Sequence, residues 1–148
     1  MKIQQLSIFL ENKPGHLDSI CRTLADADMN IVTMSLADTK QFGILRLIIE
    51  DWAKAKDVLE KVGFVVNLTE VVAMEVEDKP GGLAEILDIF QNKEINIEYM
   101  YAFTFRRGNL AMLVFRFDKP DEAIKILRDS GKNVLSQVEL FKNANSEK

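Results

Sequence analysis

The residues best suited to chemistry form a short segment at positions 11–17, which reads Glu-Asn-Lys-Pro-Gly-His-Leu. Pro14 and Gly15 allow a tight turn into a helix, and the first amides of a helix have no hydrogen-bond partner inside it. Those amides and the helix dipole attract an anion such as a carboxylate. Asn12 adds a neutral side chain that can both donate and accept hydrogen bonds. The segment therefore predicts a binding site for a small anionic group.

The same segment recurs 66 residues later, at positions 77–83, as Glu-Asp-Lys-Pro-Gly-Gly-Leu. Between residues 11 and 34, nine of 24 positions are identical at this offset, where chance gives about one or two. The identical positions are Glu11, Lys13, Pro14, Gly15, Leu17, Ile20, Asn30, Ile31 and Met34. The chain is therefore a tandem duplication, and a turn signal that occurs twice at the same point favours a functional role over a simple helix start.

The elements that must position these segments follow one pattern in both copies. Alternating apolar residues predict an opening strand in each, and apolar residues at i, i+3, i+4 and i+7 predict a helix after the Pro-Gly pair, with Cys21 on its core-facing stripe. Further strands are expected at 30–39, 44–50 and 64–66, and at 96–105, 110–117 and 134–138. Helices are expected at 52–61 and 121–129, with Gly63 and Gly131 as C-caps and with Gly43 and Gly108 in turns.

This order, β-α-β-β-α-β, occurs twice and predicts an α+β fold of two ferredoxin-like units, each with helices on one face of an antiparallel sheet. We expect domains at residues 1–70 and 71–141, connected through 67–70, and a flexible polar tail at 142–148. Apolar residues occupy both parities of the strands at 97–105 and 110–117. The second sheet face is therefore expected to be covered by a second copy of the chain or by a partner protein.

Composition excludes several classes of protein. The 148 residues are 47% hydrophobic and 28% charged, as in globular domains. A net charge of −4 argues against general binding to nucleic acids or anionic membranes. The single cysteine cannot form an internal disulfide or supply a thiolate metal cage. We expect no metal and no cofactor. Neither a bilayer-spanning apolar run nor a signal peptide is evident, which predicts a cytoplasmic protein.

Enzymes and RNA-binding proteins of the same topology fit poorly. An acylphosphatase-like site would place an arginine in the loop after the first strand, but the first arginine is Arg22, inside the predicted helix. The segment 107–114 lacks the aromatic residues that stack RNA bases. His16, the only histidine, has no neighbouring nucleophile or orienting carboxylate. Its ring either lines a ligand pocket or is an exposed first-turn residue. We therefore expect no catalytic residue and no enzyme.

The pattern of strand, Glu-Asn-Lys-Pro-Gly-x-Leu, helix, x-Asn-Ile and strand resembles the ACT domain, a small ligand-binding module of amino-acid metabolism. The resemblance covers residues 3–70 and 71–140. It implies that two such domains join their sheets side by side, and that an amino acid binds between the first loop of one and the second strand of the other. One implied site uses Asn12, Lys13, Pro14, Gly15, His16 and Leu17 with Asn96 and Ile97. The pseudo-symmetric site uses Asp78, Lys79, Pro80, Gly81, Gly82 and Leu83 with Asn30 and Ile31.

The two implied sites differ. Asp78 replaces the loop asparagine, and its carboxylate would repel a ligand carboxylate but could hold an ammonium group. Gly82 stands where the first copy has His16, and we expect the Asn12 site to be the better one.

The resemblance implies a non-catalytic regulatory protein that senses a free L-amino acid, and the apolar residues on both strand parities predict a homodimer through the sheet faces. Its output would pass to another protein, for which an enzyme of amino-acid metabolism is the expected partner. The alternative is a regulatory subunit or interaction module that acts on such an enzyme in trans and has vestigial ligand sites. The residues leave open which amino acid binds.

Overall fold

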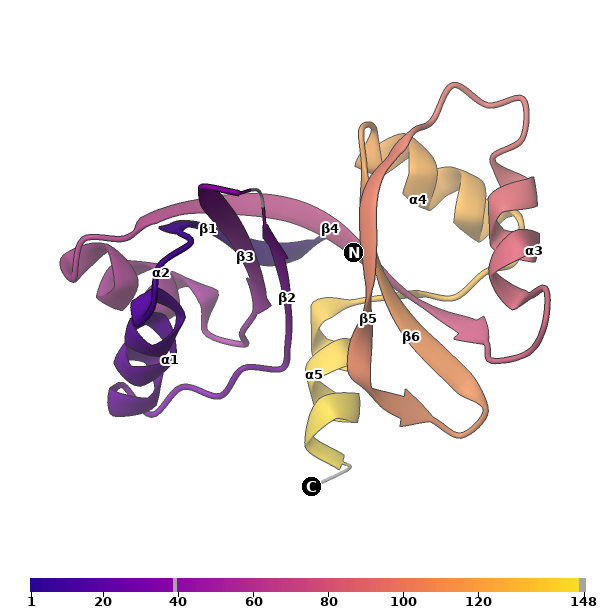
Figure 1. Ribbon diagram of the computed structural model, residues 1–148. Coiled ribbons are helices and arrows are strands. Elements are labelled where there is room, and N and C mark those ends of the chain that lie inside the picture. Colours follow the sequence, from indigo (N-terminus) through magenta and orange to yellow (C-terminus); the bar gives the residue numbers. More distant parts are fainter. Residues whose placement is uncertain (39, 147–148) are drawn as a thin grey trace. The chain divides into compact units, whose positions relative to one another are not determined.

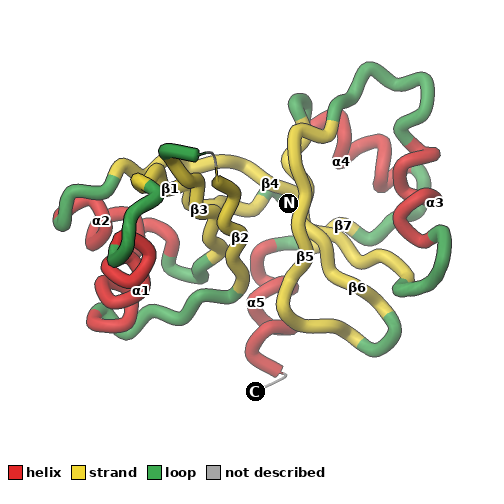
Figure 2. Tube along the Cα trace, in the orientation of Figure 1, coloured by secondary structure: helices red, strands yellow, loops and turns green. Residues whose placement is uncertain are grey.

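The computed structural model describes residues 1–38 and 40–146, and the chain divides into two compact units. The N-terminal unit is Gln4–Thr69, and the C-terminal unit combines Met1–Ile3 with Glu70–Lys148. The described residues form five helices and seven strands (Figures 1 and 2). Each unit has the predicted ferredoxin-like α+β fold, as its strand order shows.

The N-terminal unit contains β1 (Ile3–Glu11) apart from its first residue, α1 (His16–Asp26), β2 (Thr33–Asp38), β3 (Phe42–Ile48), α2 (Trp52–Lys61) and the start of β4 (Val65–Glu77). Its strand order is β2-β3-β1-β4, and β3 is antiparallel to both β2 and β1. Alternate residues of β1 and β3 face the helices because the side-chain period of a strand is two. They build the core with α1 and α2: Leu6, Ile8, Leu10, Leu45 and Leu47 pack with Ile20, Leu24, Ala55 and Leu59.

The C-terminal unit repeats this arrangement with the rest of β4, α3 (Gly82–Ile89), β5 (Ile97–Arg107), β6 (Leu110–Phe117), α4 (Pro120–Asp129) and β7 (Val134–Leu135). Its strand order is β5-β6-β4, with β7 paired to β4. Phe115 and Phe117 enter the core, where their rings stack with centroids 5.6 Å apart. Val114, opposite Tyr101 in the register, lies on the other sheet face. The structure thus shows which alternate residues of β6 face the helices, a question that the sequence left open.

Strand β4 corrects the predicted connection between the units. We expected a short strand at 64–66, a linker at 67–70 and then a new strand, but one strand runs from Val65 to Glu77. This segment contains no glycine or proline to interrupt it, and six of its 13 residues are β-branched. The Ser7 and Thr69 hydroxyls, 3.1 Å apart, also form a hydrogen bond between β1 and β4.

Smaller corrections concern β2, β3 and α1. Strand β2 begins at Thr33, three residues after Asn30, and the expected end at Thr39 lies outside the described residues. Gly43 lies within β3, opposite Leu10, instead of in a turn.

Cys21 is only half-buried, so the core stripe of α1 consists of Ile20 and Leu24. Gly63 and Gly131 follow α2 and α4 in the left-handed conformation, which confirms the predicted helix ends.

Helix α5 (Gln137–Ser146) replaces the predicted end of a strand and most of the predicted tail. It begins with a capping box: the Glu139 amide donates to Ser136 Oγ at 3.2 Å, and the Ser136 amide donates to Glu139 Oε2 at 2.8 Å. Leu140 and Phe141 are buried. The segment is therefore a capped helix with an apolar anchor. Residues 147–148 of the predicted tail lie outside the described residues.

The first residues of the chain are tied to the C-terminal unit. Lys2 Nζ lies 2.7 Å from Glu70 Oε2 and 3.2 Å from Asp121 Oδ1. The two carboxylates raise the pKa of Lys2 through these hydrogen bonds, so the amine stays charged. No helix in the described parts of the chain is long and apolar enough to cross a membrane.

Replacing Leu140 with alanine should destabilise the protein by about 2–5 kcal/mol, because the side chain is fully buried and its removal leaves a cavity. Val138 in the same helix is 78% exposed, and Val138→Ala should change stability by no more than about 0.5 kcal/mol. Chemical denaturation of the three proteins measures both values. Equal stability of L140A and wild type would show that α5 is a dispensable tail.

Candidate functional site

The first loop, residues 12–17, leads from β1 into α1 through a glycine in the left-handed conformation. Gly15 has φ 89° and is the N-cap residue of α1. The amide of Asn12 donates to the Gln41 carbonyl at 3.1 Å, and the amide of Lys13 donates to the Glu11 carbonyl at 2.8 Å. These hydrogen bonds fix the start of the loop. Gly15 then reverses the chain into the helix, a conformation that costs glycine little.

The second loop, residues 78–83, repeats this backbone between β4 and α3. Gly81 has φ 86° and is the N-cap residue of α3. The Asp78 amide donates to the Asn109 carbonyl at 2.9 Å, and the Lys79 amide donates to the Glu77 carbonyl at 3.0 Å. The backbone structure is thus shared by both copies of the motif.

Each loop leaves backbone donors without a partner at the start of its helix. The Gly15 carbonyl accepts from the Ser19 amide at 2.9 Å, but the amides of Gly15, Leu17 and Asp18 have no partner among the described residues. In the second loop the corresponding amides are those of Gly81, Leu83 and Ala84. These donors lie at the positive end of the helix dipole, where a carboxylate is stabilised.

The loop lysines are paired with acidic neighbours. Lys13 Nζ lies 2.5 Å from Glu11 Oε2, and Lys79 pairs with Glu77 and lies 3.8 Å from Glu85. The ammonium groups hold the pKa of Glu11 and of Glu77 below the ordinary value. Because the lysines are paired, the unpartnered backbone amides at the start of each helix are the donors that remain available to an anion.

The residue after the strand distinguishes the two loops. Asn12 is exposed, and its side chain has no hydrogen-bond partner among the described residues. Asp78 pairs with Arg106, whose Nη1 lies 2.7 Å from Asp78 Oδ2. Sequence reasoning missed Arg106, because its position in β5 depends on a register shift between Ala102 and Arg106 that no local pattern reveals. The acidic charge expected in the second loop is therefore compensated within the unit.

Position 82 also separates the two loops. Gly82 is buried, and a Cβ built there would lie 2.1 Å from the Glu77 carbonyl oxygen. The matching residue of the first loop, His16, is half-buried and begins α1. The second loop consequently folds more closely onto the end of its own strand than a side chain would allow.

The two Asn-Ile pairs lie at or just before the second strand of each copy. The Asn96 amide donates to Asp118 Oδ1 at 2.9 Å, whereas the exposed Asn96 side chain has no partner in the described parts of the chain. Asn30 is exposed as well, but Ile31 and Ile97 pack against the cores of their own units. Each implied site combines residues of different units, and that combination stays a prediction.

The described residues contain no candidate metal site. Within 1–38 and 40–146, no group of three or more His, Cys, Asp or Glu side chains could hold a metal ion. The donors available at the loops suit reversible binding of a small polar molecule.

Gly82→Ala should destabilise the protein by about 1–3 kcal/mol, because the added methyl group overlaps the Glu77 carbonyl and the loop has to shift. His16→Ala, the matched change in the first loop, should alter stability by no more than about 0.5 kcal/mol. Denaturant titrations compare the two variants. Equal effects would contradict the difference in packing between the loops.

The sequence model of the ACT domain pair family matches residues 1–143. Protein BT0572 from Bacteroides thetaiotaomicron is 37% identical, and its crystal structure superposes with a TM-score of 0.89 over 96% of this chain and 97% of that chain. The ligand-free regulatory subunit of aspartate kinase from Thermus thermophilus is 15% identical, with a TM-score of 0.60 over 85% of this chain and 91% of that chain. A search of curated proteins returns no match. Because the family model spans nearly the whole sequence, this chain belongs to the ACT domain pair family.

Proposed function

We propose that this protein is a non-catalytic sensor of a free L-amino acid, and that its first loop holds the ligand's carboxylate. The observation that carries the proposal is the set of unpartnered amides at Gly15, Leu17 and Asp18 beside the unpartnered side chain of Asn12. The amides can donate to both carboxylate oxygens, and the Asn12 carbonyl can accept from the ligand's ammonium group.

The second loop is the weaker of the two candidates. A ligand ammonium would have to compete with Arg106 for Asp78, and the ligand carboxylate would approach an acidic side chain. In the first loop the residue at the matching position, Asn12, is neutral and has no side-chain partner among the described residues. We therefore propose unequal affinities at the two loops.

The proposed output is regulation of an enzyme of amino-acid metabolism in trans. Among the structural neighbours, a regulatory subunit of aspartate kinase and the aspartokinase alpha and beta subunits share the fold. A ligand that binds one conformation of the chain better than another shifts the population toward it, and a partner that reads that conformation responds. The alternative is a regulatory module whose ligand sites are vestigial, and a binding screen separates the two.

A thermal-shift screen against all common L-amino acids should single out one ligand, because a ligand at ~100 times its Kd adds about 2.7 kcal/mol of stability. Asn12→Ala should then lower the affinity about fivefold to tenfold in a calorimetric titration, since one hydrogen bond contributes about 1 kcal/mol. Asn96→Ala tests the predicted contribution of the other copy in the same way. Asn145→Ala, an exposed asparagine of α5, is the matched control.

A flat screen would contradict the sensor proposal and favour the alternative with vestigial sites. Wild-type affinity in both N12A and N96A would instead contradict the assignment of the first loop and its predicted complement, while leaving amino-acid binding itself intact.

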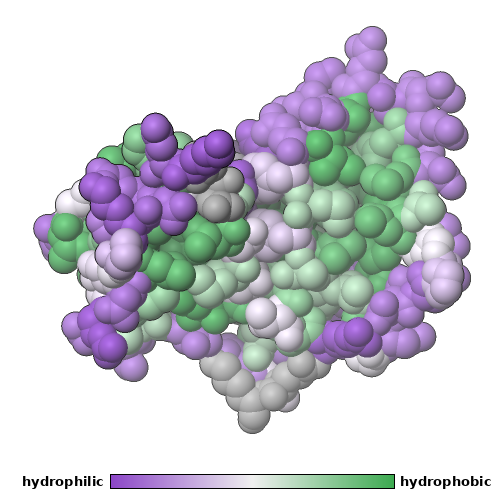
Figure 3. All heavy atoms as spheres, in the orientation of Figure 1, coloured by the Kyte–Doolittle hydropathy of each residue, from purple (hydrophilic) through white to green (hydrophobic). Residues whose placement is uncertain are grey.

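We also propose that the chain forms a homodimer through the sheet face opposite the helices. In the N-terminal unit this face carries Phe9, 48% exposed, and Phe42, 55% exposed. Ile44, directly opposite Phe9 in the register, adds to the same surface. Figure 3 shows that hydrophobic residues also reach the surface in both units. Exposed aromatic residues on a sheet face favour burial against a second protein surface.

Sedimentation should show a dimer for the wild type, and Phe9→Ser combined with Phe42→Ser should shift the equilibrium to the monomer by removing the apolar contact. Val138→Ser removes an exposed apolar side chain elsewhere and should leave the dimer unchanged. A wild-type protein that sediments as a monomer at every concentration would rule out this proposal.

A further inference from the structure

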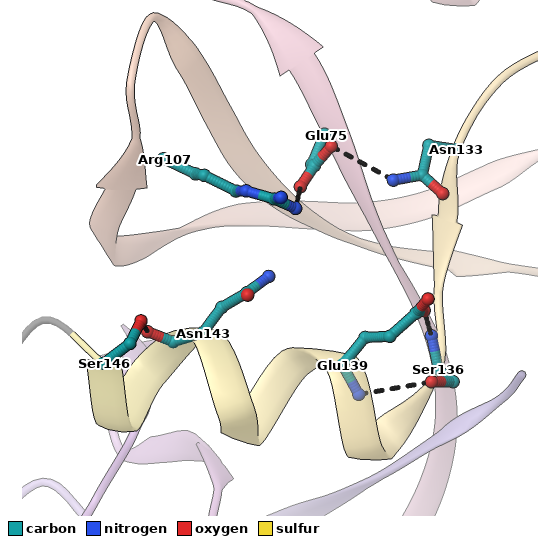
Figure 4. Close-up of polar contacts among 7 residues, drawn as sticks. All are labelled: Glu75, Arg107, Asn133, Ser136, Glu139, Asn143 and Ser146. Atoms are coloured by element: carbon teal, nitrogen blue, oxygen red, sulfur yellow. Dashed lines mark hydrogen bonds and ion pairs between the residues drawn. The ribbon is translucent and has the colours of Figure 1, made fainter.

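A polar hollow of about 270 Å³ lies in the C-terminal unit, and it shares no residue with either loop. Its lining residues are Arg107, Asn133, Leu135, Glu139, Lys142 and Asn143. Three of them, Glu139, Lys142 and Asn143, are spaced i, i+3 and i+4 on α5 and therefore share one face of that helix. Figure 4 shows the Asn143 side chain extending from α5 toward the side where Glu75 and Arg107 lie.

The wall opposite α5 is held in place by a buried carboxylate. The Glu75 side chain is only 8% exposed, and its Oε1 accepts from Arg107 Nη1 at 3.1 Å. Its Oε2 accepts from Asn133 Nδ2 at 3.1 Å (Figure 4). Because both oxygens of Glu75 are engaged, Arg107 and Asn133 are fixed at the edge of the hollow.

The α5 wall, in contrast, has polar groups to offer. Asn143 Nδ2 is buried without a hydrogen-bond partner, and Lys142 Nζ has no acidic partner among the described residues. Glu139 accepts from the Ser136 amide through Oε2, which leaves Oε1 available. The hydrogen bonds from Ser136 lower the pKa of Glu139, so this carboxylate is ionised at neutral pH. Two donors and one charged acceptor therefore face the hollow from one helix.

We propose that this hollow is a second amino-acid site, in which Lys142 and Asn143 bind the carboxylate and Glu139 binds the ammonium group of a small zwitterion. The charges around the hollow balance, since Arg107 and Lys142 oppose Glu75 and Glu139. Because these charges cancel, neither a dianion such as phosphate nor a simple cation gains a net electrostatic attraction from the hollow. A zwitterion matches both signs and supplies the acceptor that Asn143 lacks.

Glycine is the direct probe, because it carries both charged groups and no side chain. In ¹H–¹⁵N spectra of the full chain, glycine should shift the signals of residues 133–146 and of the Asn143 side-chain amide. Acetate and methylammonium, which carry one charged group each, should bind at least about tenfold more weakly than glycine. Unmoved signals at residues 133–146 with glycine up to about 50 mM would overturn the proposal, as would acetate binding as tightly as glycine.

Variants separate this site from the first loop. Lys142→Gln changes an exposed residue and should weaken glycine binding at residues 133–146 about tenfold, as should Asn143→Leu. Asn145→Leu is the matched control on α5 and should bind like the wild type. Asn12→Ala should leave these shifts unchanged. A failure of the first-loop proposal can therefore be distinguished from a failure of the proposed site on α5. Wild-type binding by both K142Q and N143L would overturn the assignment.

Discussion

One backbone constraint underlies both candidate loops: the chain has to leave a strand and enter a helix through a left-handed residue. Gly15 and Gly81 have φ values of 89° and 86°, which an L side chain adopts only with strain. Their carbonyls accept the first hydrogen bonds of α1 and α3, from Ser19 and Glu85. As at the start of any helix, the first amides have no acceptor within the helix. The anion site that we propose at the first loop thus depends on how the chain enters the helix.

Duplication preserved this backbone and let the side chains diverge. The first loop keeps a neutral asparagine and a half-buried histidine, whereas the second has an acid paired with Arg106 and a glycine that no other residue can replace without displacing Glu77. Two loops with matching backbone hydrogen bonds therefore offer different electrostatic surroundings to a ligand. For the sensor that we propose, this difference would let one loop specialise in ligand binding while the other stabilises its unit.

Local patterns predicted the repeat, the ferredoxin-like fold, helix α2 and strand β6 at their observed bounds, because apolar periodicity reports directly on burial. They failed where tertiary structure decides. Residues 67–70 look like a polar linker, yet backbone pairing keeps them in β4. The capping signature Ser-x-x-Glu at 136–139 marks the start of α5, but the buried residues that follow it, Leu140 and Phe141, are too few to form a helical apolar pattern. Arg106 reaches Asp78 through a register shift that no sequence period encodes.

Strand β4 has a consequence for the evolution of the protein. Residues 65–69 of this strand belong to the N-terminal unit, and residues 70–77 belong to the C-terminal unit. The first three residues of the chain, Met1–Ile3, also belong to the C-terminal unit. A gene cut back to either copy would lose part of a strand, and the second copy would also lose Lys2 and its pairs with Glu70 and Asp121. The two copies have ceased to be exchangeable modules.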